Sequence, residues 1–238
     1  MNGINQIIDG STPYCIFASY IEAYESYIHH IKFGWGSSII DPEIKLKIKL
    51  LKSKSIGFSP GGTLFEYFYN KKQLNKYNEF LRLHNFEWVE LSRGTICIKD
   101  SDYYSLIKEY SAHYKVLSEI GYKSVINSDN MSTMDWVSGC ERSLEAGASL
   151  VIIEARETGT AGIIDRNGLI KSDIIKELLT NIAISKIIFE APTKQLQSYL
   201  INNYGSSVNM GNISFENILP LEALRRNLRS DTLNNRSR

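Results

Sequence analysis

The sequence has few cysteines, few prolines and no long hydrophobic run. Its three cysteines, Cys15, Cys97 and Cys140, are widely spaced and form no CxxC pair, which excludes a disulfide framework and a zinc knuckle. No apolar run is long enough to cross a bilayer, and the N terminus has neither the basic segment nor the apolar stretch of a signal peptide. We therefore expect a soluble, cytoplasmic protein.

An excess of charge of one sign is also missing. The chain has 27 Lys and Arg against 26 Asp and Glu, a net charge of +1, so no overall field attracts nucleic acid or an anionic membrane. The basic residues from Lys45 to Lys54 alternate with Ile and Leu, which is typical of a solvated helix face. We expect small molecules as partners, with neither nucleic acid nor membrane among them.

The sequence does contain eight short runs rich in β-branched residues, and most of them end in a charged or amide side chain. Their ends are Asp9, Lys32, Pro60-Gly61-Gly62, Glu90, Glu119, Glu154, Glu190 and Asn209. Most of the runs are roughly 20–35 residues apart, the length of a strand plus a helix. Amphipathic stretches such as 132–146 lie between them, and no linker divides the chain. The pattern predicts an α/β fold, a single (β/α)8 barrel over residues 1–238 with a polar tail at about 233–238.

The carboxyl ends of the predicted strands collect acidic groups. Because side chains alternate between the two faces of a strand, several of these ends point into the same mouth. The expected set is Asp9, Glu90, Glu119, Glu154 and Glu190, facing Lys32 and Arg156. Carboxylates crowded in a dry cavity repel one another, and a divalent cation relieves the repulsion. Oxygen ligands favour Mg²⁺ over zinc, so we predict Mg²⁺ on Glu90, Glu119, Glu154 and Glu190. The alternative is a cluster neutralised by Lys32 and Arg156 without metal.

Six segments in order along the chain resemble one family, the phosphosulfolactate synthases. They are Lys32-Phe33-Gly34-Trp35-Gly36-Ser37-Ser38, Pro60-Gly61-Gly62-Thr63-Leu64-Phe65-Glu66, Ile152-Ile153-Glu154-Ala155-Arg156-Glu157, Ile188-Phe189-Glu190-Ala191-Pro192, Gly205-Ser206-Ser207-Val208-Asn209 and Leu224-Arg225-Arg226-Asn227-Leu228-Arg229-Ser230-Asp231-Thr232. The resemblance implies a (β/α)8 barrel that adds sulfite to phosphoenolpyruvate, giving phosphosulfolactate, with Mg²⁺ as cofactor. It also implies that Lys123, just after the fifth strand, is the general acid. Lys32 and Arg156 would help to polarise the substrate carboxylate.

The phosphate group of such a substrate needs donors. In barrels these often come from the loops after strands seven and eight. We therefore predict substrate contacts from Arg156, Ser206, Ser207, Asn209, Gly211, Arg225 and Arg226. The alternative for Arg225 and Arg226 is a solvated helix face or a subunit contact, since outer helices of barrels often make symmetric contacts in homo-oligomers.

Three positions depart from the family pattern. Gly10 stands where a lysine is typical, Arg93 where an acid is typical, and Tyr122 where a second lysine is common. These changes at the predicted mouth leave three alternatives open: a relative with another nucleophile or another enolpyruvate or 2-oxo acid substrate, a Schiff-base enzyme using Lys32 or Lys123, and a barrel without catalytic activity.

Overall fold

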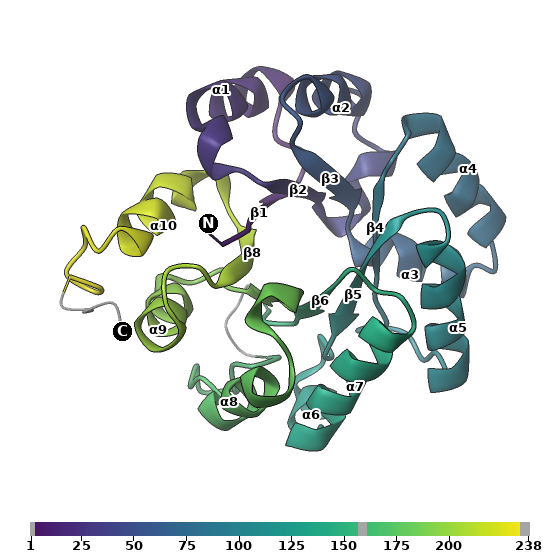
Figure 1. Cartoon of the computed structure of the whole chain (residues 1–238). Coiled ribbons are helices and arrows are strands. Elements are labelled where there is room, and N and C mark those ends of the chain that lie inside the picture. Colours follow the sequence, from purple (N-terminus) through teal and green to yellow (C-terminus); the bar gives the residue numbers. More distant parts are fainter. Residues whose placement is uncertain (1–2, 157–160, 234–238) are drawn as a thin grey trace.

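A parallel sheet of eight strands lies at the centre of the computed structural model, with helices around it (Figure 1). The structure describes residues 3–156 and 161–233. The strands are β1 (Asn5–Asp9), β2 (His30–Phe33), β3 (Gly57–Pro60), β4 (Trp88–Leu91), β5 (Lys115–Ile120), β6 (Leu150–Ile153), β7 (Ile187–Glu190) and β8 (Asn209–Ile213). Their order, β3-β2-β1-β8-β7-β6-β5-β4, is that of a barrel, which confirms the predicted (β/α)8 fold.

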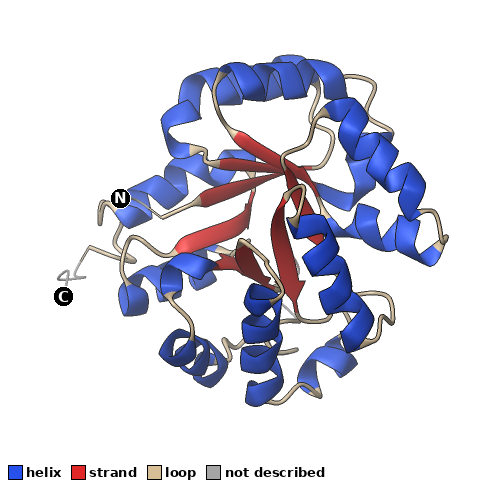
Figure 2. Cartoon of the chain, turned by 45° about the vertical axis from the view of Figure 1, so that its right-hand side comes forward, coloured by secondary structure: helices blue, strands red, loops and turns tan. Residues whose placement is uncertain are grey.

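The helices pack around the outside of the strands, as a second view shows (Figure 2). They are α1 (Tyr14–Tyr24), α2 (Ile44–Ser53), α3 (Gly62–Asn70), α4 (Leu74–His84), α5 (Asp100–Ser111), α6 (Val125–Asp129), α7 (Thr133–Glu145), α8 (Ser172–Asn181), α9 (Lys194–Tyr204) and α10 (Ile218–Arg225), with short 3-10 turns at 25–27, 34–39, 184–186 and 215–217. Ser132 begins α7 with a capping box to Asp135. Within the described ranges, no helix has both the length and the apolarity to cross a membrane.

The strands present different residues on their two faces. One face packs under the helices in the large core, with Ile7, Val89, Val116, Val151 and Ile187 among its members. The other face forms a small separate cluster, Leu117, Ile152 and Ile188, which lies in the barrel interior. Two residues further along each strand, this inner face carries acidic side chains, because the period of a strand is two. The functional groups therefore lie above an apolar layer at the carboxyl ends.

The hydrogen-bonded sheet has two ends, β3 and β4. These strands contact each other, but within the described residues no backbone ladder joins them, and we call this place the β3–β4 seam. A polar contact links the two sides, since the Gly62 backbone N–H donates to Glu90 Oε1 over 2.8 Å. The barrel is thus closed at one position by side chains instead of a strand ladder.

His30 leads to a prediction for pH-dependent stability. It is buried at the amino end of β2, with Nε2 2.9 Å from Ser59 Oγ. Burial, followed by the charge of Lys32, lowers the pKa of His30 from 6.5 to about 3. As pH falls through this window the unfolded chain takes up a proton that the folded chain does not bind, so the free energy of unfolding falls.

The substitution His30→Gln removes this pH-dependent contribution to the free energy of unfolding. We expect the free energy of unfolding to fall less steeply between about pH 6 and pH 5, by roughly 1 kcal/mol per pH unit. Urea unfolding of both proteins across this range measures the difference. Equal slopes would contradict a neutral His30 in the folded protein.

Candidate active site

Lys32 lies at the centre of the predicted acidic mouth. Its Nζ is 2.8 Å from Glu190 Oε1 and 3.2 Å from Glu90 Oε1, and all three side chains are buried. Burial alone would lower the pKa of Lys32, but Glu190 and Glu90 outweigh it and raise that pKa well above its usual value. Lys32 is therefore a fixed positive charge joining β2 to β4 and β7, and it is unsuited to be a neutral Schiff-base nucleophile.

Glu119 and Glu154 form a second pair, in which their carboxyl groups share a hydrogen bond. Burial, and then the charges of Glu190 and Glu119, raise the pKa of Glu154 well above its usual value. Burial opposes ionisation of Glu119 as well, but Lys123 and Lys32 outweigh it and lower its pKa to about 2. The pair therefore holds one proton and one negative charge.

A glycine makes room for Glu154. Gly121 has a φ of +126°, and a Cβ there would lie 2.7 Å from Glu154 Cβ. Any larger residue would be strained in this backbone conformation and would collide with the acid.

Two carboxyl oxygens of these buried acids lack hydrogen-bond partners in the described part of the chain. Glu90 Oε2 and Glu154 Oε2 are buried without a hydrogen bond. Burial, opposed by Lys32, raises the pKa of Glu90 to about 7. No three His, Cys, Asp or Glu side chains among the described residues converge on a ready metal-binding geometry. Buried carboxylate oxygens still fit Mg²⁺, which usually takes one or two protein carboxylates plus substrate oxygens and water.

Lys123 lies beside the second pair. Its Nζ is 3.8 Å from Glu119 Oε1 and donates to Thr63 Oγ1 over 3.2 Å. Glu119, more than the opposing burial, raises the pKa of Lys123, so the side chain is protonated near neutral pH. The Lys123 backbone N–H donates to the Gly94 carbonyl, which fixes the other end of the residue. A positioned ammonium at this place can deliver a proton.

The sequence pattern predicted no role for Glu66, Ser92 or Thr95. Ser92 Oγ lies 2.5 Å from Glu66 Oε1 and 2.9 Å from Glu119 Oε1, and Thr95 Oγ1 donates to Glu66 Oε2. A hydroxyl has one proton, so its second carboxylate contact requires a proton on one of the acids. Glu66 thereby holds the loop whose Gly94 carbonyl binds Lys123. The available signal was a lone acid among the apolar residues of α3.

Replacing Glu66 by alanine should loosen this loop. The change removes the acceptor of the Thr95 hydroxyl and one of the two acids that the buried Ser92 hydroxyl contacts, and each lost hydrogen bond costs about 0.5–1.5 kcal/mol. We expect a loss of stability of that size and faster amide hydrogen exchange at Gly94 and Thr95. Glu79→Ala, an exposed acid on α4, is the control. Unchanged exchange in Glu66→Ala would remove Glu66 from this role.

Asp9 is not part of the acidic cluster, contrary to expectation. It is buried on the outer face of β1, where Oδ2 lies 2.7 Å from Lys47 Nζ, and Lys47 also contacts Asp41 at 2.6 Å. Strand alternation explains the difference, because Asp9 has the parity of the core residue Ile7. Gly10 next to it leaves space for the Trp35 ring, since a Cβ there would lie 2.0 Å from that ring.

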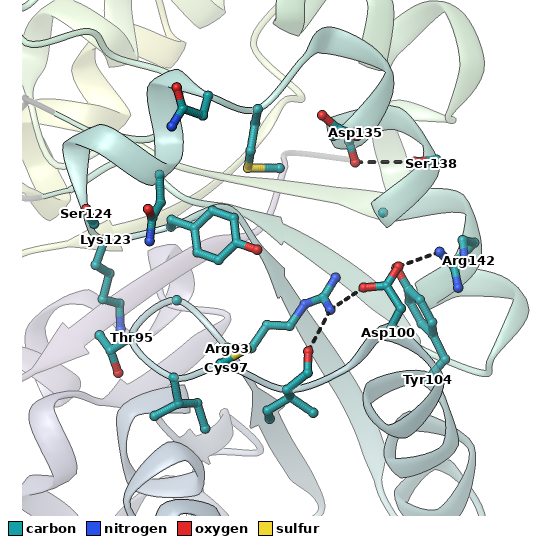
Figure 3. A pocket seen from close by; sticks show the side chains of 18 of the residues that line it. Arg93, Thr95, Cys97, Asp100, Tyr104, Lys123, Ser124, Asp135, Ser138 and Arg142 are labelled. Atoms are coloured by element: carbon teal, nitrogen blue, oxygen red, sulfur yellow. Dashed lines mark hydrogen bonds and ion pairs between the residues drawn. The ribbon is translucent and has the colours of Figure 1, made fainter.

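Arg156 and Arg93 line a cavity beside the acidic cluster. Figure 3 shows Arg93 in this cavity. The cavity has a volume of about 940 Å³, and Lys123 and Tyr122 also line it. Arg156 is exposed and donates from Nη1 to the Lys123 carbonyl over 3.1 Å. Arg93 pairs with Asp100 at 2.5 Å. Two of the positions that depart from the family pattern, Arg93 and Tyr122, thus lie in this cavity.

The predicted phosphate site is not assembled at the mouth. Asn209 begins β8 instead of ending it, and its side chain bonds Ile4 and Ile187 at the amino end of the barrel. Ser206 and Ser207 precede it, and the buried Arg225 donates to the Ser206 carbonyl and to Asn5.

The remaining two members of that set lie apart from each other. Arg226 contacts Glu222 and Tyr27. Gly211 is level with the mouth, paired in register with Glu190. The placement of Asn209 at the end of a strand was wrong, because β8 begins at this polar residue and continues to Ile213.

Several solved structures share this barrel fold. A 3-keto-L-gulonate-6-phosphate decarboxylase from Vibrio cholerae aligns with a TM-score of 0.59 at 11% identity, covering 95% of this chain and 96% of that one. A phosphonopyruvate hydrolase, solved with oxalate and Mg²⁺, aligns with a TM-score of 0.57 at 13% identity, covering 95% and 81%. At these identities the likeness supports the barrel fold alone.

Sequence relatives are much nearer. The phosphosulfolactate synthase of Bacillus subtilis is 37% identical over 231 residues, 97% of this chain and 92% of the relative. That of Methanocaldococcus jannaschii is 39% identical over 235 residues, 97% and 93%. The family model of (2R)-phospho-3-sulfolactate synthase (ComA) matches residues 1–231. With this match over nearly its whole length, the chain belongs to the phosphosulfolactate synthase family.

Proposed function

We propose that this protein adds sulfite to C3 of phosphoenolpyruvate to form phosphosulfolactate. The observation that carries the proposal is the protonated Lys123 beside the buried pair of Glu119 and Glu154. A nucleophile that attacks an enolpyruvate needs both a proton donor for C2 and positive charge near the carboxylate, and this arrangement offers the first directly.

The bond changes are simple. The sulfur lone pair of sulfite forms the new bond to C3, and the electron pair of the double bond moves through C2 into the carboxylate. As this electron pair returns from the carboxylate to C2, Lys123 gives its proton to C2 and is left as the neutral amine, and the phosphate ester remains intact. Lys32 would provide positive charge near the negative charge that develops on the carboxylate, and Arg156, beside Lys123, would bind the anionic groups of the substrate.

Mg²⁺ is the proposed cofactor, held by oxygen atoms from the set Glu90, Glu119, Glu154 and Glu190. The cation would polarise the substrate carboxylate when bound. The unpartnered oxygens of Glu90 and Glu154 support this assignment, because buried carboxylate oxygens without a proton donor are costly unless a cation binds them.

Glu119→Gln tests the metal role. The change removes the charge of an acid whose pKa is lowered to about 2, so we expect the Mg²⁺ concentration for half-maximal activity to rise at least about tenfold, with one charged ligand lost. A Mg²⁺ titration of activity in both proteins measures it. Glu109→Gln, on the outer helix α5, is the matched control. Identical Mg²⁺ dependence would move the ligand role away from Glu119.

Product analysis by mass spectrometry after incubation with phosphoenolpyruvate, sulfite and Mg²⁺ tests the reaction itself. A sulfonate product supports the proposal. No product together with a phosphoenolpyruvate-dependent thermal shift would favour a relative with another nucleophile, and no shift at all would favour a barrel without this activity.

Two accompanying expectations belong with the proposal. The cysteines Cys15, Cys97 and Cys140 are free, which supports a cytoplasmic location. Self-association through the outer helices stays a prediction.

A further inference from the structure

The acidic cluster is a poor place for a phosphate group. Among the described residues it contains five buried acids, Glu66, Glu90, Glu119, Glu154 and Glu190, and their positive partners are Lys32 and Lys123. A phosphate dianion placed among these side chains would be repelled at short range in a medium of low dielectric constant. The phosphate of a substrate that reacts at Lys123 must therefore lie to one side of them.

The cavity beside Lys123 has the opposite charge. Its described lining contains four cations, Arg93, Lys123, Arg142 and Arg156, and two acids, Asp100 and Asp135. Asp135 is occupied by the Ser132 backbone and side chain in the capping box of α7. The cavity therefore has an excess of positive charge. It adjoins the acidic cluster at Gly94, Thr95 and Lys123.

Two of the arginines share one carboxylate (Figure 3). Arg93 Nη1 lies 2.5 Å from Asp100 Oδ1, and Arg142 Nη1 lies 2.6 Å from Asp100 Oδ2. Both guanidinium groups also lie over the Tyr104 ring, at 5.8 Å and 4.2 Å from its centre. One negative charge cannot balance two positive ones, so this pair keeps a net positive charge and is held in place by stacking.

We propose that this cavity is the phosphate subsite, in which Arg142 and Arg156 bind the dianion of a phosphate monoester and Arg93 keeps Asp100 turned away from it. The identity of the monoester rests on the proposed function, whereas the anion site rests on the cavity. The ester would extend from the arginines toward Lys123, which lines the same space. Planar guanidinium groups suit this ligand because each can donate two hydrogen bonds to one phosphate.

The test is calorimetric titration of the full chain with inorganic phosphate. Arg156→Gln and Arg142→Gln should each raise the dissociation constant about tenfold or more, the usual cost of a charge-assisted hydrogen bond. Arg82→Gln, an exposed arginine on α4 that does not line the cavity, should leave it unchanged. Arg156 makes no ion pair within the described residues, so its variant keeps the assay informative if Arg142→Gln unfolds.

Two results would overturn the subsite. One is unchanged phosphate affinity in Arg156→Gln and in folded Arg142→Gln. The other is loss of affinity in Arg226→Gln instead, which would return the phosphate to the amino end of the barrel. Displacement of phosphate by phosphoenolpyruvate supports the assignment, whereas displacement by sulfite alone would reassign the cavity to the nucleophile. The two proposals can also fail separately. If the wild-type protein forms no sulfonate but the cavity variants bind phosphate more weakly than it does, the proposed function is overturned and the anion site stands.

Discussion

Lys123→Ala is expected to lower turnover by about 10²–10⁴-fold, the usual contribution of a general acid. Lys123 is protonated and its ammonium is fixed between Thr63 and Glu119, while the backbone of the same residue is fixed by Gly94. Removal of this group takes away the proton for C2 and leaves the acidic cluster and Lys32 in place. Steady-state kinetics and calorimetric titration with phosphoenolpyruvate separate the two effects, and we expect affinity to change much less than turnover.

Two variants serve as controls for this result. Lys123→Arg keeps the positive charge next to Glu119 but gives up a proton far less readily, so it should remain slow while binding substrate. Lys115→Ala removes an exposed lysine at the start of β5 and should have full activity. An active Lys123→Ala would assign the proton donor to another residue.

Lys32→Met should have the largest effect on stability, a loss of about 3–5 kcal/mol, as is usual when one partner of a buried ion pair is removed. Glu90 and Glu190 would both lose the cation that balances them inside the barrel. Urea unfolding at about pH 8, one pH unit above neutrality, measures the loss. We expect the loss to shrink at about pH 5, because Glu90, whose pKa is raised to about 7, is then protonated.

A second substitution makes this prediction specific. In Lys32→Met, the carboxylates of Glu90 and Glu190 are left buried without a cation. Adding Glu190→Gln removes one of these two charges, so the double variant should be more stable than Lys32→Met alone. Lys186→Met should cost little, because this lysine lies outside the barrel interior and its only partner among the described residues is the Ser149 carbonyl at 3.4 Å. A small loss in Lys32→Met, independent of pH, would mean that Lys32 does not balance the two acids.

Strand alternation was sufficient to predict the acidic cluster. Glu90, Glu119 and Glu190 lie on the inner face, at the last or next-to-last position of their strands, so the count of two from an inner-face residue places them correctly. The same rule places Asp9 outside, and the expectation failed there because its parity was not applied. At Asn209 the reason is different, since its amide bonds neighbouring backbone at the amino end and does not mark the end of a strand.

Contacts between distant segments were beyond the reach of sequence reasoning. Asp100 meets Arg142 across 42 positions, and Glu66 meets Ser92 across 26. Such pairs depend on how neighbouring helices and loops are turned around the barrel, which strand spacing does not determine. The cavity of arginines and the loop held by Glu66 therefore became visible only in three dimensions.

At the β3–β4 seam, the closure of the barrel depends on the charge of one side chain. The other neighbouring strands of the described barrel are joined by backbone ladders, whereas here the link is the side chain of Glu90, which accepts from the Gly62 amide and forms an ion pair with Lys32. A proton or cation taken up by Glu90 weakens it as an acceptor. We therefore expect the contact between α3 and β4 at this seam to loosen when Glu90 takes up a proton or a cation.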